Sequence, residues 1–191
     1  MRHLIIACGL LLALAGIPSI ATTAAGANDP GDTAAQQAAR ARANSVEYWN
    51  TKAERAQAAT VRWQTVVRGR PPQHASSHTS NANSPQEARD NARAWHRRAV
   101  AAWRRATHPP QRRAWYCIHH YEGSWSDPNA PYWGGLQMDY TFQSTYGAWL
   151  LKHEGTADHW APLAQIWAGV RAWRVRGFAP WSTTAHACGV Y

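Results

Sequence analysis

Apolar residues recur at intervals of three and four along much of this 191-residue chain, a spacing typical of helices that bury one face. The first such stretch, residues 33–68, contains no proline and predicts a long helix rich in Ala, Arg and Gln. A second helix is predicted from Ser84 to about Ala106, because Ser84 and Glu87 have capping-box spacing and proline suits the first helical position. We therefore expect a helical hairpin joined by the polar loop 69–83.

Residues 111–191 are richer than the preceding segment in aromatic side chains and in Pro and Gly residues that interrupt helices. Pro109 and Pro110 end the second helix, because proline lacks the amide hydrogen that a helix interior needs. Further helices are predicted by the apolar spacing over residues 110–122, 141–153 and 162–176. The stretch 127–137 carries Pro and Gly and suits a loop or a short β-hairpin. The expected fold class is mainly α, with a helical arm over 28–110 and a small domain after it.

Two of the predicted helices have apolar faces that we expect to be buried. The face of the second helix comprises Trp95, Ala99, Ala102 and Trp103. The face of the last helix comprises Leu163, Ile166, Trp167, Val170 and Trp173. Gly177 follows the last helix and is expected to end it.

The first residues have the pattern of a secretory signal. A basic start is followed by an apolar run from Leu4 to Ile17 and then by Ala25-Gly26-Ala27, a cleavage pattern. The run is too short to span a bilayer. We expect residues 1–27 to be removed, leaving an extracellular protein associated with the cell wall and without a membrane span.

Removal of the signal leaves two cysteines, Cys117 and Cys188. A pair of cysteines in an exported chain predicts a disulfide, here worth about 4 kcal/mol because the closed loop is long. The cysteines and scattered histidines form no metal-binding spacing, so no metal and no cofactor is expected.

Positive charge is concentrated in the arm. The formal net charge is +9, and residues 28–110 contain 13 Lys and Arg against 6 Asp and Glu, whereas residues 111–191 contain 6 against 5. A basic exported protein can be retained by anionic polymers of the wall. Nucleic acid is the other usual partner of a basic segment, and the predicted secretion argues against it.

Glu122 is the residue with the clearest chemical context. It is expected at the C-terminal end of a helix and is followed closely by Trp125, Tyr132 and Trp133. Aromatic side chains desolvate a carboxyl group, favour its protonated form and stack on sugar rings. The negative end of a helix dipole acts in the same direction. This pattern indicates a general acid for cleavage of a glycosidic bond.

Four motifs follow one another in a specific order in the C-terminal part. They are Glu122-Gly-x-Trp, Tyr132-Trp-Gly-Gly-Leu-Gln, Thr141-Phe-Gln-Ser-Thr-Tyr-Gly, and Arg176-Gly-Phe-Ala-Pro-Trp with a closing Ala187-Cys-Gly. The series resembles the catalytic domain of resuscitation-promoting factors, which belongs with the transglycosylase-like proteins of the lysozyme superfamily. The resemblance covers about residues 115–189 and leaves out the helical arm.

This resemblance implies a small lysozyme-like domain of the goose type and cleavage of the MurNAc–GlcNAc bond of peptidoglycan. The family's catalytic glutamate falls on Glu122, and its disulfide cysteines match Cys117 and Cys188. Its glycine-rich sugar groove falls on Tyr132, Trp133, Gly134, Gly135, Leu136 and Gln137. In many relatives a cysteine directly precedes the glutamate, whereas Tyr121 does so here, which indicates a variant subgroup.

Several roles remain open between substrate binding and structure. Trp125 and Trp133 suit sugar stacking or core packing, Gly134 and Gly135 suit close approach of a sugar or a tight turn, and Gln137 suits amide contacts or loop support. His119 and His120 adjoin the acid, and structural or exposed positions are expected for both rather than a metal site.

The ordinary two-acid mechanisms of glycosidases need a second carboxylate. The candidates are Asp127 and Asp139, with Glu154 and Asp158 expected to be solvated loop acids. Asp127 precedes a proline and suits a turn, and Asp139 suits a helix N-cap. A single-acid lytic transglycosylase is therefore favoured over a hydrolase. The alternative is a non-catalytic protein that binds peptidoglycan.

Overall fold

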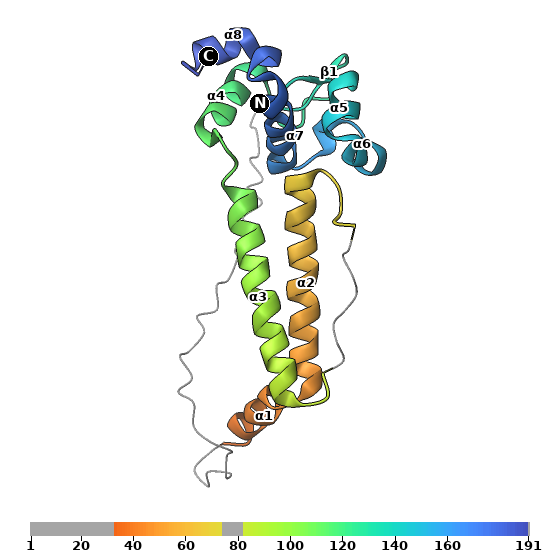
Figure 1. Ribbon diagram of the computed structural model, residues 1–191, viewed down its shortest axis with the longest axis vertical. Coiled ribbons are helices and arrows are strands. Elements are labelled where there is room, and N and C mark those ends of the chain that lie inside the picture. The colour runs from red at the N-terminus through yellow and green to blue at the C-terminus, as the bar shows by residue number, and fades with distance from the viewer. Residues whose placement is uncertain (1–32, 74–81, 191) are drawn as a thin grey trace, which may run out of the picture. The chain divides into compact units, whose positions relative to one another are not determined.

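The computed structural model describes residues 33–73 and 82–190 (Figure 1). The predicted signal segment 1–27 and the middle of the predicted loop 69–83 lie outside the described residues. The chain divides into two units, the second of which begins at Arg40 and contains every element from α2 onward. Helix α1 (Ala34–Ala43) begins in the first unit, and none of its residues is buried.

The prediction of one long helix over residues 33–68 is wrong, because the chain forms α1 and then a separate helix, α2 (Val46–Arg68). Between them the Ser45 hydroxyl accepts a hydrogen bond from an amide in the first turn of α2 and caps that helix. The indole of Trp49 donates to the carbonyl of Ala43 at the end of α1. Apolar spacing runs across the break, whereas side-chain capping acts locally and decides where a helix starts.

The second predicted helix is confirmed as α3 (Pro85–Thr107). The Ser84 hydroxyl accepts from the Glu87 amide at 3.2 Å, as the capping box predicts. The Glu87 carboxylate accepts from the amide of Asn83, one residue before the cap, at 2.9 Å.

Helices α2 and α3 lie side by side and run in the same direction, so the expected hairpin is wrong (Figure 1). Near their N-termini, the Arg89 guanidinium of α3 lies over the Trp49 ring of α2 at 5.4 Å. Near their C-termini, Val67 and Ala106 both accept hydrogen bonds from helix α7 (Pro162–Arg176). A helix of this length spans about 35 Å, and a connection of about 16 extended residues reaches farther than that. The connection is therefore long enough to join the C-terminal end of α2 to the N-terminal end of α3 when the two helices run in the same direction.

The fully buried side chains of these two helices are small. They are Ala53 and Thr60 on α2, and Ala88, Ala92 and Ala106 on α3. Small residues let two helix backbones approach closely. Trp103 was expected on the buried face but is 42% exposed, because the covered stripe of α3 recurs at residues 88, 92, 95, 99, 102 and 106 and Trp103 lies one position beyond it.

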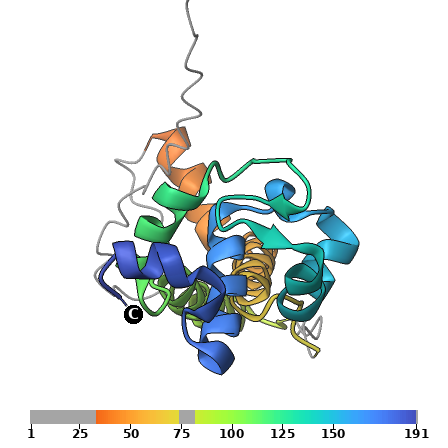
Figure 2. The same cartoon turned by 90° about the horizontal axis from the view of Figure 1, so that it is seen from above.

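The C-terminal part consists of short elements around one long helix (Figure 2). Its helices are α4 (Arg112–Glu122), α5 (Tyr140–Tyr146), α6 (Ala148–Glu154), α7 and α8 (Ser182–Ala187), with the 3₁₀ turns η1 (Ala157–His159) and η2 (Ala179–Trp181). The expected short hairpin is present as β1 (Tyr132–Trp133) and β2 (Met138–Asp139), an antiparallel pair in which Tyr132 lies opposite Asp139. The described residues are therefore mainly α with one two-stranded sheet, as predicted.

The helix predicted over residues 141–153 is divided at Gly147 into α5 and α6. A Cβ atom at Gly147 would lie 2.4 Å from the buried ring of Trp160, so the ring packs directly on the backbone there. Apolar spacing continues through this position, and only the packing of a residue 13 positions later marks the break.

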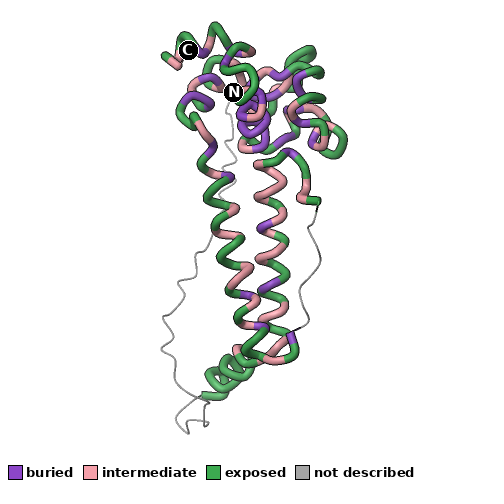
Figure 3. The backbone as a smooth tube through the Cα atoms, viewed as in Figure 1, coloured by how far each residue is buried: buried purple, intermediate pink, exposed green. Residues whose placement is uncertain are grey.

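Helix α7 matches its predicted bounds and ends at Gly177, which has φ of 59°. Instead of one apolar stripe, it buries residues on most of its surface (Figure 3). The residues that complete this burial are small or amide-bearing: Ala164, Gln165, Ala168, Gly169 and Ala172. A Cβ at Gly169 would lie 3.0 Å from the buried Trp115 ring. Because glycine has no side chain, Trp115 of α4 can pack directly on the backbone of α7. Helix α7 is thus the central helix of the C-terminal part.

Helix α7 also joins the C-terminal part to the helix pair. The Trp167 indole donates to the carbonyl of Ala106, near the end of α3, at 2.9 Å. Within the described ranges, no helix combines the length and apolar character needed to cross a membrane.

Candidate active site

Glu122 is the last residue of α4, and Gly123 ends that helix with φ of 146°. Its carboxylate is half-buried, and Oε1 accepts a hydrogen bond from the Thr184 hydroxyl of α8 at 2.8 Å. The contact joins residues 62 positions apart. Sequence reasoning did not assign a role to Thr184, and neither η2 nor α8 was predicted as a helical element.

The predicted disulfide between Cys117 and Cys188 is present, with a Cα–Cα distance of 5.9 Å. Cys117 lies on α4, five residues before Glu122, and Cys188 directly follows α8. The crosslink therefore holds the helix of Thr184 against the helix of Glu122. Its effect on the site is to limit how far this hydroxyl can move from the carboxylate.

The Thr184 hydroxyl can form a hydrogen bond with Glu122 whether this carboxyl group is ionised or protonated. Its oxygen lies 2.8 Å from Glu122 Oε1 and 3.2 Å from the Trp181 carbonyl oxygen. A hydroxyl has one hydrogen and two lone pairs. It can donate to an ionised carboxylate, or donate to the carbonyl of Trp181 and accept from a protonated carboxyl. A group that alternates between acid and base benefits from such a partner.

Asp127 and Gln137 meet beside the backbone that follows Glu122. Gln137 Nε2 donates to Asp127 Oδ2 at 2.9 Å and to the carbonyl of Gly134 at 3.0 Å. A Cβ at Gly123 would lie 3.4 Å from Gln137 Nε2 and 3.5 Å from Asp127 Oδ2, so both side chains contact this glycine. Asp127 also accepts from the amide of Asn129 at 3.1 Å, the turn geometry its sequence context predicts. Gln137 is thus shown supporting the loop, and contact with a substrate stays a prediction.

The two adjacent glycines of the β1–β2 turn are closely packed by protein atoms. A Cβ at Gly134 would lie 2.5 Å from Gln165 Oε1, and one at Gly135 would lie 2.5 Å from His119 Nδ1 and 2.6 Å from the Trp125 ring. Gly134 also has φ of 72°, which favours glycine. These contacts explain both glycines without a ligand, and approach of a sugar to them stays a prediction.

Trp125 stacks on His119, with ring centroids 3.8 Å apart and planes at 19°. His119 Nδ1 lies 3.2 Å from the carbonyl oxygen of Gly135, so this histidine supports the turn, while His120 is exposed. Trp125 and Trp133 are half-buried against the hydrophobic core, and Tyr132 is 49% exposed. The structure therefore brings Trp125 to the glycine turn, and sugar stacking by these three rings stays a prediction.

The other candidate acids differ in their surroundings. Asp139 Oδ1 accepts from the Phe142 amide at 2.6 Å and caps α5, as its position predicts. Glu154 is exposed, as expected. Asp158 was expected to be solvated, but its side chain is only 9% exposed and Oδ2 lies 3.1 Å from His159 Nδ1. This expectation was wrong because η1 folds the acid against the protein instead of leaving it in an open loop.

Two buried glutamines, to which no role was assigned from the sequence, hold the site loops in place. Gln165 Oε1 accepts from the Gly135 amide at 2.8 Å, and its Nε2 donates to the carbonyls of Trp125 at 2.7 Å and Trp160 at 3.0 Å. Gln143 likewise donates to the carbonyl of Met138 and accepts from the Ala157 amide. A glutamine inside an otherwise apolar helix pattern is the signal that could have identified Gln165.

Within the described ranges, no cluster of three or more His, Cys, Asp or Glu side chains could hold a metal ion. Comparison of the chain with protein-family models, curated proteins and solved structures found no match.

Proposed function

We propose that this protein is a secreted, wall-associated enzyme that cleaves the MurNAc–GlcNAc bond of peptidoglycan, with Glu122 as general acid and base, in a lysozyme-like domain of the goose type. The observation that carries the proposal is the pairing of a half-buried carboxylate at a helix end with the adaptable Thr184 hydroxyl. The motif resemblance supports the same assignment. Trp125, Tyr132 and Trp133 would bind sugar rings beside the acid.

The proposed reaction is that of a lytic transglycosylase. Glu122 protonates the bridging oxygen, and the N-acetyl group of the substrate stabilises the cationic sugar carbon. Glu122 then takes a proton from the 6-hydroxyl, which closes a 1,6-anhydro ring. Asp127 and Asp139 are both engaged in local hydrogen bonds, which favours this route over one in which a second carboxylate activates water.

The test is mass spectrometry of the soluble products released from purified peptidoglycan. Protein starting at residue 28 should release anhydro-muropeptides, and Glu122→Gln should lower the rate by about 100-fold or more. The matched control is Glu154→Gln, which changes an exposed acid and should retain activity. Reducing-end products would contradict the lytic route and direct attention to Asp127→Asn. Equal release by the Glu122→Gln variant would contradict the assignment of the acid.

The second candidate function is binding of peptidoglycan without cleavage. The exposed Tyr132 and the half-buried Trp125 and Trp133 favour it, because sugar stacking needs no acid. In the same experiment it predicts that native protein and Glu122→Gln both sediment with peptidoglycan and that neither releases products.

Thr184→Val should slow product release about tenfold, because the hydroxyl that positions the Glu122 carboxylate is lost while the side-chain shape is kept. Thr184→Ser retains the hydroxyl and should recover most of the rate. The measurement is initial rate against substrate concentration, and the loss should appear in kcat rather than KM. A valine variant as active as the native protein would remove Thr184 from the mechanism.

A further inference from the structure

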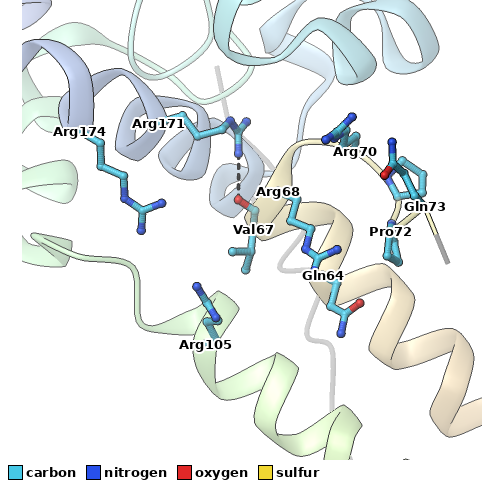
Figure 4. Close-up of a pocket in the computed structure, with 10 residues that line it drawn as sticks. Gln64, Val67, Arg68, Arg70, Pro72, Gln73, Arg105, Arg171 and Arg174 are labelled. Atoms are coloured by element: carbon cyan, nitrogen blue, oxygen red, sulfur yellow. Dashed lines mark hydrogen bonds between the residues drawn. The ribbon is translucent and has the colours of Figure 1, made fainter. Parts of the chain in front are cut away.

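A strongly basic cavity lies at the C-terminal ends of α2 and α3, against α7 (Figure 4). Its volume is about 680 Å³, and five of its ten lining residues are arginines: Arg68, Arg70, Arg105, Arg171 and Arg174. Among the described residues, none that lines it is acidic. In Figure 4 the side chains of Arg105, Arg171 and Arg174 converge on the space beside Val67.

The cavity continues along the helix pair. A second cavity of about 450 Å³ shares Gln64, Val67, Arg68 and Arg105 with the first and adds Arg98 and Trp63. We call the lining arginines of the two cavities together the arginine groove: Arg68, Arg70, Arg98, Arg105, Arg171 and Arg174. Two adjoining cavities lined by six arginines suit a ligand with several anionic groups rather than a single small ion.

The positive charge of the arginine groove is not neutralised by acidic side chains. Among the described residues, the ion pairs Arg93–Asp90 and His159–Asp158 include no groove arginine. Two helix C-termini contribute only about half a negative charge each. Six arginines therefore leave a clear surplus of positive charge.

Arg171 is held firmly at the floor of the groove. Its Nε donates to the carbonyl of Tyr146 at 2.6 Å and its Nη1 to the carbonyl of Val67 at 3.1 Å. Burial, with a smaller contribution from neighbouring Arg174, lowers the pKa of Arg171 to about 10. The guanidinium is still charged at neutral pH, and its half-buried charge acts through a lower dielectric than those of the exposed arginines.

We propose that the arginine groove binds the phosphate groups of a linear polyol-phosphate polymer of the cell wall. The arginines approach from α2, α3, α7 and the segment after α2, and a tetrahedral phosphate offers oxygens in several directions, whereas a carboxylate offers them in one plane. Proteins that bind single-stranded nucleic acid place several aromatic stacking platforms along a basic groove, whereas Trp63 in the second cavity is the one aromatic side chain among the described residues that line the two cavities. The choice of a wall polymer as the source of phosphate rests on the proposed extracellular function.

The test measures binding of poly(glycerol phosphate) by titration calorimetry, using protein starting at residue 28. Arg105→Gln with Arg174→Gln should weaken binding about tenfold or more, because both guanidinium groups face the cavity. The matched control is Arg97→Gln with Arg176→Gln, which removes equal charge from exposed positions on α3 and α7 outside the groove. This control should change the affinity less than about twofold, and inorganic tripolyphosphate should compete for the groove.

Equal weakening by the two variant pairs would overturn the proposal in favour of unspecific charge attraction. Tighter binding of a single-stranded oligonucleotide of equal charge would overturn the proposed wall polymer and assign nucleic acid as the ligand. Equal binding of polyglutamate would remove the preference for phosphate. Glu122→Gln should bind the polymer like native protein, so failure of the catalytic proposal is distinguishable from failure of this one.

Discussion

Gln165→Met should lower the free energy of unfolding by about 3 to 6 kcal/mol. Methionine keeps the length and approximate volume of the side chain but has no amide. The substitution leaves the Gly135 amide and the carbonyls of Trp125 and Trp160 without their buried partner. Each buried polar group without a partner costs about 1 to 3 kcal/mol. Denaturant unfolding of native and variant protein measures the difference.

Two further variants separate hydrogen bonding from packing at this position. Gln165→Glu keeps an acceptor for the Gly135 amide but turns a second oxygen toward two carbonyls, so it should be at least as destabilising as methionine. Gln86→Leu, at an exposed glutamine on α3, should change stability by less than about 0.5 kcal/mol. A loss below about 1 kcal/mol for Gln165→Met would show that the loops do not depend on these bonds.

Loss of the disulfide is the second change with a large expected effect. Cys117→Ala with Cys188→Ala should lower the free energy of unfolding by about 4 kcal/mol in the chain-entropy account. The crosslink joins residues 71 positions apart, and it closes most of the C-terminal part into one loop. Because α8 is then no longer tied to α4, the contact between Thr184 and Glu122 should weaken as well. Product release by the folded variant should therefore fall toward that of Thr184→Val.

The control for the disulfide is its reduction. A reducing agent should shift the unfolding midpoint of the native protein toward that of the double variant and leave the variant unchanged. The stabilisation proposed for the disulfide would be contradicted if the oxidised native protein and the double variant unfolded at the same denaturant concentration.

The parallel arrangement of α2 and α3 could not be read from their apolar spacing. Alanine seams of the same kind fit parallel and antiparallel neighbours. The contact between Arg89 and Trp49 at one end, and the hydrogen bonds from Arg171 and Trp167 at the other, distinguish the two arrangements. The parallel arrangement also places Arg68 and Arg105 in the same cavity. The arginine groove is therefore a consequence of helix direction and was not visible as a motif.

Interactions within a few residues were determined by the sequence itself. The Ser84 cap, the Asp139 cap and the bounds of α7 follow from neighbouring side chains and backbone groups, whose chemistry is present in the local sequence. The disulfide could also be predicted, because removal of the predicted signal segment would leave two cysteines, which have one possible pairing. Glu122 was singled out by the residues that surround it in the chain.

Only the tertiary structure decided which distant groups meet. Thr184 reaches Glu122 across 62 positions, Gln165 reaches Gly135 across 30, and Trp160 packs on Gly147 across 13. Such contacts depend on how the helices pack against one another. The type of residue at a position therefore does not identify its distant partner. The sequence therefore determined α3, α7 and the candidate acid, whereas packing determined the break between α5 and α6 and the partners that hold this acid and its loops in place.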